Sequence, residues 1–208
     1  MAVNEAIVAA WQAMSLWELA AVLSGIAYLL LAMKEKISCW YAALGSTAIY
    51  TVLFWDVSLL MDSALQVYYM AMAVYGWYQW QRKDNSGKAE LPISRWSWQT
   101  HSAVIASTIW LSFMSGWLLQ NNTDAAWPYL DSFTTWGAVV TTYMVAKKIL
   151  ENWLYWIVID GIAAFLYVDR GLYLTALLMA VYVVIVVIGY VQWRALYRNE
   201  QGLCPATA

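Results

Sequence analysis

The chain has 208 residues, of which 63% are hydrophobic and only 12% are charged, about half the charged fraction of a typical soluble domain. This composition excludes a soluble globular protein and indicates an integral membrane protein of several spans. The formal net charge of -2 gives no sign of nucleic-acid binding. The two cysteines, Cys39 and Cys204, fit neither a disulfide framework nor a metal site.

Hydrophobic runs of membrane-spanning length follow one another along the chain after an amphipathic lead. The seven expected spans cover residues 17–33, 40–55, 60–80, 98–119, 129–146, 153–168 and 172–193. They divide the chain into an external N-terminal lead (1–16), a first three-helix bundle (17–81), a polar cytoplasmic linker (82–97), a connecting fourth helix (98–120), a second three-helix bundle (129–194) and a cytoplasmic tail (195–208).

The loops between these spans differ sharply in charge, and cytoplasmic loops carry an excess of Lys and Arg. One set of alternate loops holds Lys34, Lys36, Arg82, Lys83, Lys88, Arg95, Lys147, Lys148, Arg194 and Arg198. The other set holds only Arg170. The sequence therefore predicts an external N-terminus and a cytoplasmic C-terminus.

The two bundles repeat each other at a constant offset of 113 residues. The sharpest match sets Gly-Trp-Tyr-Gln-Trp at 76–80 against Gly-Tyr-Val-Gln-Trp at 189–193. Further pairs are Lys34 and Lys147, Trp40 and Trp153, Asp56 and Asp169, and Tyr69 and Tyr182. Since the fourth span restores the orientation of the second copy, a parallel 3+1+3 repeat is expected, as in the SWEET transporters. Gly76 and Gly189 are expected to permit close helix approach.

The sixth span carries polar residues at membrane depth. Asn152, Trp156 and Asp160 are spaced i, i+4, i+8 and therefore share one face of a helix. A carboxylate inside a bilayer costs about 2.5 to 3.5 kcal/mol, so Asp160 indicates either a polar cavity or a structural partner with a hydroxyl or amide. Trp153, at the start of this span, fits both an interfacial anchor and a site residue.

The third span presents a second polar and aromatic face, formed by Gln66, Tyr69, Trp77 and Trp80. Such a stripe is compatible with helix packing and with a pocket, and Gln66 within it favours the pocket. Tyr182 in the seventh span aligns with Tyr69, and both fall near the middle of their spans. The two tyrosines are expected where the bundles meet.

Two segments are particular enough to suggest a family. Trp-Tyr-Gln-Trp-Gln-Arg ends the third span, and Glu-Asn-Trp-Leu-Tyr-Trp opens the sixth. With the 3+1+3 layout, these segments resemble the bacterial PnuC nicotinamide riboside transporters over nearly the whole chain. The resemblance implies a SWEET-like fold, facilitated diffusion of nicotinamide riboside, a homotrimer, and trapping of the substrate by phosphorylation. Sister families carry thiamine or riboflavin, which remain alternative substrates.

A passive transporter is the function that these features favour. Aromatic rings would stack on a flat cationic ring, amides would bind its carboxamide or hydroxyls, and Asp160 would supply a counter-charge. The expected substrate-binding residues are Gln66, Tyr69, Trp77, Trp80, Asn152, Trp153, Trp156, Asp160 and Tyr182. A seven-helix retinal receptor is disfavoured because residues 172–193 contain no Lys. No catalytic, phosphate-loop or metal motif is present, so neither an enzyme nor a bound cofactor is expected.

Overall fold

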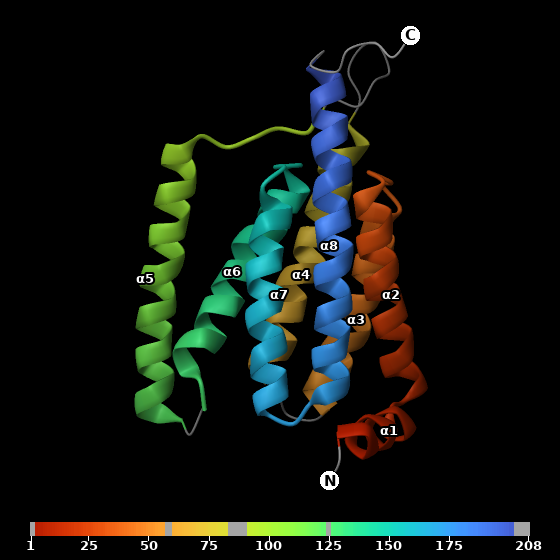
Figure 1. The fold of residues 1–208 in the computed structure, drawn as a ribbon, viewed down its shortest axis with the longest axis vertical. Helices are drawn as coiled ribbons and strands as arrows, with labels where there is room; N and C mark the ends of the chain where they lie inside the picture. The colour runs from red at the N-terminus through yellow and green to blue at the C-terminus, as the bar shows by residue number, and fades with distance from the viewer. Residues whose placement is uncertain (1–2, 57–59, 83–90, 124–125, 202–208) are drawn as a thin grey trace.

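The computed structural model describes residues 3–56, 60–82, 91–123 and 126–201. These residues form eight α-helices, shown in Figure 1. Their bounds are α1 Val3–Ala13, α2 Leu16–Met33, α3 Cys39–Asp56, α4 Leu60–Gln81, α5 Trp98–Asn122, α6 Pro128–Ala146, α7 Asn152–Asp169 and α8 Tyr173–Glu200. Lys83, Lys88 and Cys204 lie outside the described residues.

The all-helical architecture agrees with the sequence, and each expected span corresponds to one helix from α2 to α8. Helix α1 was not predicted, and α8 continues beyond its expected end to Glu200. Among the described residues, only α2, α5 and α8 are both long and apolar enough to qualify as membrane spans by length and hydropathy. The other long helices carry several Tyr and Trp side chains together with Ser, Thr, Gln, Asn or Asp, which lower their mean hydropathy.

Six helices form a closed ring. Each packs against the next in the order α2, α3, α4, α6, α7 and α8, and α8 returns to α2. Helix α5 lies outside this ring and packs on α6, while α1 lies across one end of the bundle and contacts α8 (Figure 1). Residues that point into the ring therefore come from both halves of the chain.

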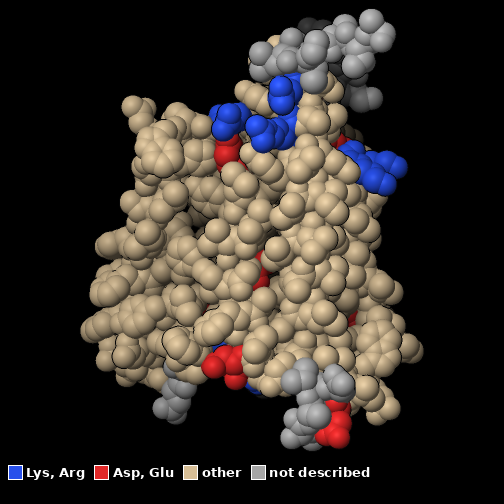
Figure 2. Space-filling model, viewed as in Figure 1, with Lys and Arg blue, Asp and Glu red and all other residues tan. Residues whose placement is uncertain are grey.

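The two ends of the ring differ in charge (Figure 2). We call one the basic end; its described cations are Lys34, Lys36, Arg82, Arg95, Lys147, Lys148, Arg194 and Arg198. We call the other the acidic end, where Glu5, Glu18, Asp56, Asp131 and Asp169 accompany Arg170. This division follows the alternation of the loops expected from the sequence.

Helices α2 and α6 end in the same kind of turn at the basic end. Glu35 and Lys148 both have a φ of 52°, in the left-handed region that commonly follows a helix and usually takes glycine. After α2, the amide of Lys36 donates to the carbonyl of Leu31, and after α6 the amide of Ile149 donates to the carbonyl of Met144. Both turns are therefore Schellman caps, and they occupy aligned positions of the two halves.

Four tryptophans fill the ring near the basic end; we call them the tryptophan cluster: Trp40, Trp80, Trp153 and Trp193. The Trp40 and Trp80 rings meet edge to face with centroids 5.3 Å apart, as do the Trp153 and Trp193 rings. The indole of Trp80 donates to the carbonyl of Ala146 on α6, and that of Trp193 donates to the carbonyl of Ala32 on α2. All six ring helices therefore take part in this cluster.

Two glycines make room for the cluster. A Cβ atom at Gly76 would collide with the Trp40 ring, and one at Gly189 would lie 2.6 Å from the Trp153 ring. The expectation that both glycines permit close helix approach is confirmed.

Candidate substrate site

Asp160 lies near the middle of α7 and is only 6% exposed. Tyr69 on α4 and Tyr182 on α8 lie within electrostatic range of this carboxyl group. Three of the predicted residues, on three ring helices, therefore lie within electrostatic range, with Asp160 as the group common to both pairs. We call Asp160, Tyr69 and Tyr182 the Asp160 cluster.

Further hydroxyl groups surround this cluster. The Tyr182 hydroxyl lies against Gly25 on α2, where an added Cβ atom would be 2.8 Å from the phenolic oxygen. Tyr28 and Tyr167 lie within electrostatic range of Tyr69. A carboxylate ringed by phenols offers acceptors and donors for hydroxyl groups and a negative charge for a cation.

The cluster is not symmetric between the halves. The position aligned with Asp160 is Thr47 on α3, whose hydroxyl donates to the carbonyl of Ala43 at 2.8 Å within its own helix. Tyr69 and Tyr182 are therefore matched across the ring, but the carboxylate comes from one half only.

Trp156 lies between the Asp160 cluster and the tryptophan cluster. It stands one helical turn before Asp160, about 6 Å along the axis. Its ring is partly buried and packs against the core that contains the tryptophan cluster. Trp156 is therefore the aromatic side chain of α7 best placed to cover a ligand bound at Asp160.

Asn152 and Trp153 lie at the basic end, apart from this cluster. Eight residues of helix, about 12 Å, separate Asn152 from Asp160. Asn152 is fully buried and its side-chain amide donates to the carbonyl of Ile149 at 2.6 Å, which braces the turn before α7. Trp153 is 1% exposed and belongs with Trp80 to the tryptophan cluster.

The two remaining predicted residues lie on α4. The indole of Trp77 donates to the hydroxyl of Tyr41 at 3.0 Å, and Tyr41 is 61% exposed, so this contact lies towards the periphery between α3 and α4. Gln66 is partly buried, one turn before Tyr69 on the acidic side. Of the two, Gln66 lies nearer to the Asp160 cluster along the helix.

Sequence reasoning missed an ion pair between the two Schellman turns. The ammonium group of Lys148 lies 2.7 Å from the carboxylate of Glu35 and 4.8 Å from the centroid of the Trp80 ring. The side chain of Lys148 is only 7% exposed. The sequence feature that could have indicated this ion pair is the offset of 113, which aligns Glu35 with Lys148.

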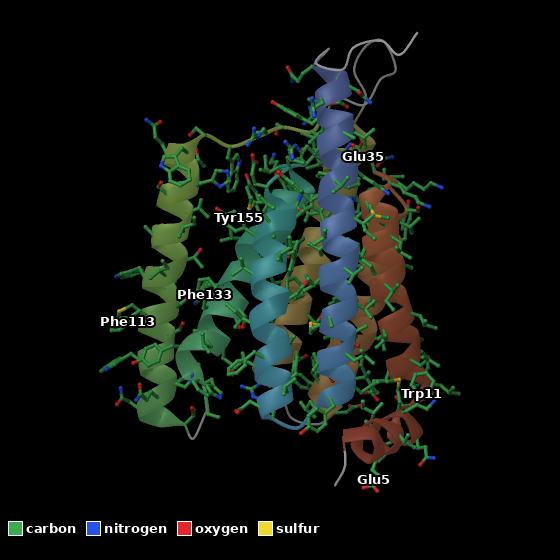
Figure 3. The ribbon with its side chains drawn as sticks, in the orientation of Figure 1. Glu5, Trp11, Glu35, Phe113, Phe133 and Tyr155 are labelled. Carbon is green, nitrogen blue, oxygen red and sulfur yellow. The ribbon has the colours of Figure 1, made fainter. Side chains whose placement is uncertain are left out.

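The segment before α5 also does more than link two helices. Ser94 exchanges backbone hydrogen bonds with the turn before α7, and Ile93 is 2% exposed. Arg95 binds the buried carboxylate of Glu151 at 2.6 Å, which raises the pKa of Arg95. His101 on α5 contacts the Tyr155 hydroxyl of α7 at 2.8 Å (Tyr155 is labelled in Figure 3). This part of the expected linker is therefore docked on the basic end.

A ring of helices with a buried carboxylate and an aromatic cluster at one end is compatible with a multi-pass membrane transporter. Residues 15–195 match the family model described as nicotinamide mononucleotide transporter. The chain belongs to that family.

Individual relatives agree with this assignment. The chain is 26% identical over 185 residues to the nicotinamide riboside transporter PnuC of Escherichia coli (strain K12), with 77% of each chain covered. It is 26% identical over 130 residues to the riboflavin/roseoflavin transporter RibM of Streptomyces davaonensis, with 62% of this chain and 61% of that protein covered. A crystal structure of the vitamin B3 transporter PnuC matches with a TM-score of 0.71 and 19% identity, covering 95% of this chain and 88% of that chain. The fold is therefore shared with that structure.

Proposed function

We propose that this chain takes up nicotinamide riboside across a bacterial plasma membrane by facilitated diffusion, and is not an enzyme. The observation that carries the proposal is the Asp160 cluster, a buried carboxylate within electrostatic range of two aligned tyrosines, with Trp156 one helical turn before it on α7. We take the substrate from the similarity to the Escherichia coli relative, which is a nicotinamide riboside transporter.

The chemistry of the substrate suits these residues. Nicotinamide riboside has a flat pyridinium cation, a carboxamide and ribose hydroxyls. Trp156 would stack on the cation, where a desolvated contact contributes about 2 kcal/mol. Asp160 would neutralise the charge or accept a ribose hydroxyl, and Tyr69, Tyr182 and Gln66 would bind the remaining polar groups. We assign Asn152, Trp80 and Trp153 to the closure at the basic end and Trp77 to its border.

The architecture that we propose has seven membrane spans, α2 to α8, arranged as a parallel 3+1+3 repeat of the SWEET type. The aligned Schellman turns and the aligned Trp–Gly contacts support the repeat. The basic end would face the cytoplasm and the N-terminus the outside, because Lys and Arg are retained on the cytoplasmic side. A homotrimer is proposed from the resemblance to PnuC proteins.

Release to the cytoplasm would require the basic end to open. The tryptophan cluster and the ion pair of Glu35 with Lys148 close this end in the present conformation. A carrier of this type alternates access by moving one repeat against the other around a central site. The contacts between halves at the basic end are those that this movement would separate.

A binding titration of the purified protein tests the proposal. Nicotinamide riboside should bind more tightly than thiamine or riboflavin, and more tightly than nicotinamide mononucleotide, whose phosphate would meet the carboxylate of Asp160. Riboflavin is the second candidate because of the similarity to RibM. Saturable binding of riboflavin without binding of nicotinamide riboside would reverse the assignment.

A further inference from the structure

Helix α1 is held at a sharp angle to α2 by a defined corner. Ser15 has an extended backbone and begins α2 with a capping box, in which its hydroxyl accepts from the amide of Glu18 and its amide donates to the Glu18 carboxylate. This cap starts a new helix at Leu16, so α1 cannot continue the axis of α2. In Figure 1, α1 lies across the acidic end, roughly perpendicular to the ring helices.

The two sides of α1 differ in chemistry. Ile7 and Trp11 are four residues apart and share one face, whereas Glu5 and Gln12 are seven apart and share another. Figure 3 shows Trp11 on the side of α1 nearer the bundle and Glu5 pointing away from the bundle. The helix therefore turns its indole towards the bundle and its carboxylate away from it.

The apolar surface of α1 continues into the lipid-facing surface of the bundle. Trp11 is 58% exposed, and Leu16 and Trp17, which follow at the base of α2, are 84% and 68% exposed. Farther along α2, Leu23 is 56% exposed. Exposed apolar side chains therefore follow one another along the chain from α1 to the first half of α2, and tryptophan is enriched where apolar surface meets the headgroups.

We propose that α1 is an in-plane helix that binds the headgroup region of the outer leaflet, with Trp11 in the lipid and Glu5 and Gln12 in water. An amphipathic helix of this kind inserts its apolar face at the boundary between headgroups and acyl chains. The partner is a lipid surface, and it requires no basic residue on α1. This inference uses the membrane orientation given under Proposed function but is independent of the substrate.

Site-directed spin labelling tests the depth of α1. Single cysteines at Trp11, Glu5, Gln12 and Leu23 would be introduced into a background with Cys39→Ala and Cys204→Ala, labelled, and reconstituted into phosphatidylcholine vesicles. Collision rates with oxygen, which dissolves in lipid, and with a nickel chelate, which stays in water, give a depth parameter. The depth parameter should be positive at Trp11 and at Leu23, which serves as the reference for a lipid-exposed position. It should be negative at Glu5 and Gln12.

A second measurement avoids a cysteine at Trp11. The difference in fluorescence between the parent and Trp11→Phe reports on Trp11 alone. This difference signal should be quenched by lipids brominated near the glycerol and unaffected by aqueous iodide. A negative depth parameter at Trp11, equal to that at Glu5, together with iodide quenching, would overturn the proposal and place α1 in water. Loss of nicotinamide riboside binding would contradict the proposed substrate and leave this result unchanged.

Discussion

Glu35 and Lys148 are 113 positions apart, have the same left-handed φ of 52°, and bind each other through an ion pair of 2.7 Å. Each follows the last residues of a ring helix, α2 or α6, and so the pair ties the first half of the chain to the second. Lys148 also lies over the ring of Trp80. The ion pair and the tryptophan cluster thus form one continuous closure at the basic end.

Neutralising Glu35 should destabilise this closure. Glu35→Gln leaves the buried ammonium of Lys148 without its carboxylate. Breaking a buried ion pair in this way costs about 3 kcal/mol at the lower end of the usual range. We expect this lower value because Glu35 is partly exposed. Unfolding of the purified protein by heat and by sodium dodecyl sulfate should show the loss.

The matched control is Lys36→Gln, at an exposed position of the same turn, which should leave the stability unchanged. The exchange Glu35→Lys with Lys148→Glu should recover most of what Glu35→Gln loses. Equal stability of Glu35→Gln and the parent would mean that the pair contributes nothing to closure.

The glycines beneath the tryptophan cluster should not tolerate a methyl group. Gly189→Ala places a Cβ atom 2.6 Å from the Trp153 ring, and overpacking of this kind costs about 1 to 3 kcal/mol. Gly76→Ala should behave in the same way against Trp40. Thermal unfolding measures both changes.

Two other helix glycines provide the comparison. Gly45 and Gly161 have open space where a Cβ atom would lie, so alanine there should be neutral or stabilising by about 0.5 to 1 kcal/mol. If all four alanine variants have the same unfolding temperature, the tryptophan cluster is not tightly packed.

The Asp160 cluster should carry the affinity for substrate. Asp160→Asn removes the buried charge, and Trp156→Ala removes the stacking surface; each should weaken binding of nicotinamide riboside at least tenfold, since about 1.4 kcal/mol is one decade. Calorimetric titration gives the change directly. Asp169→Asn, at the exposed acidic end, is the control and should bind like the parent.

Uptake should respond to membrane potential. A passive carrier of a pyridinium cation lets the cation distribute across the membrane until its concentration gradient balances the membrane potential. The free energy of one elementary charge changes by about 2.3 kcal/mol per 100 mV. A potassium diffusion potential of about 100 mV, negative inside vesicles, should therefore give about 50-fold accumulation. Accumulation that needs a proton or sodium gradient at zero potential would exclude facilitated diffusion.

The orientation can be read with reporters at the two ends. A fusion after Arg198 should be cytoplasmic and one at Asn121 should be external, because Arg198 belongs to the basic end and Asn121 to the opposite end of α5. Reporter activity on the same side for both fusions would contradict the proposed seven spans.

The helices were predictable because each apolar run is bounded by charges or breakers. The predicted span 98–119 and the helix Trp98–Asn122 begin at the same residue, since Ser97 supplies the N-cap. Helix α1 was missed because its eleven residues are too short to span a membrane. The end of α8 was missed because its polar last turns were interpreted as part of the cytoplasmic tail, whereas the helix continues through Arg198.

The binding residues of the candidate site stay a prediction. Asp160 lies within electrostatic range of Tyr69 and Tyr182, the two tyrosines that the offset of 113 pairs. Helical spacing also grouped Asn152 with Asp160, although Asn152 lies nearer the basic end, because periodicity predicts the face of a helix but not the depth along it. Docking of Ser94 on the turn before α7 involves backbone groups, which leave no mark in the sequence.

The Glu35–Lys148 pair also bears on how such a chain could have arisen. Two identical three-helix proteins related by a twofold axis would bring the same residue of each copy together at this position. A glutamate would then face a glutamate, or a lysine a lysine, and the contact would be repulsive. Only halves that mutate independently, as they do once joined in a single gene, can place opposite charges there. On the repeat proposed above, this ion pair is therefore younger than the duplication that produced the two halves.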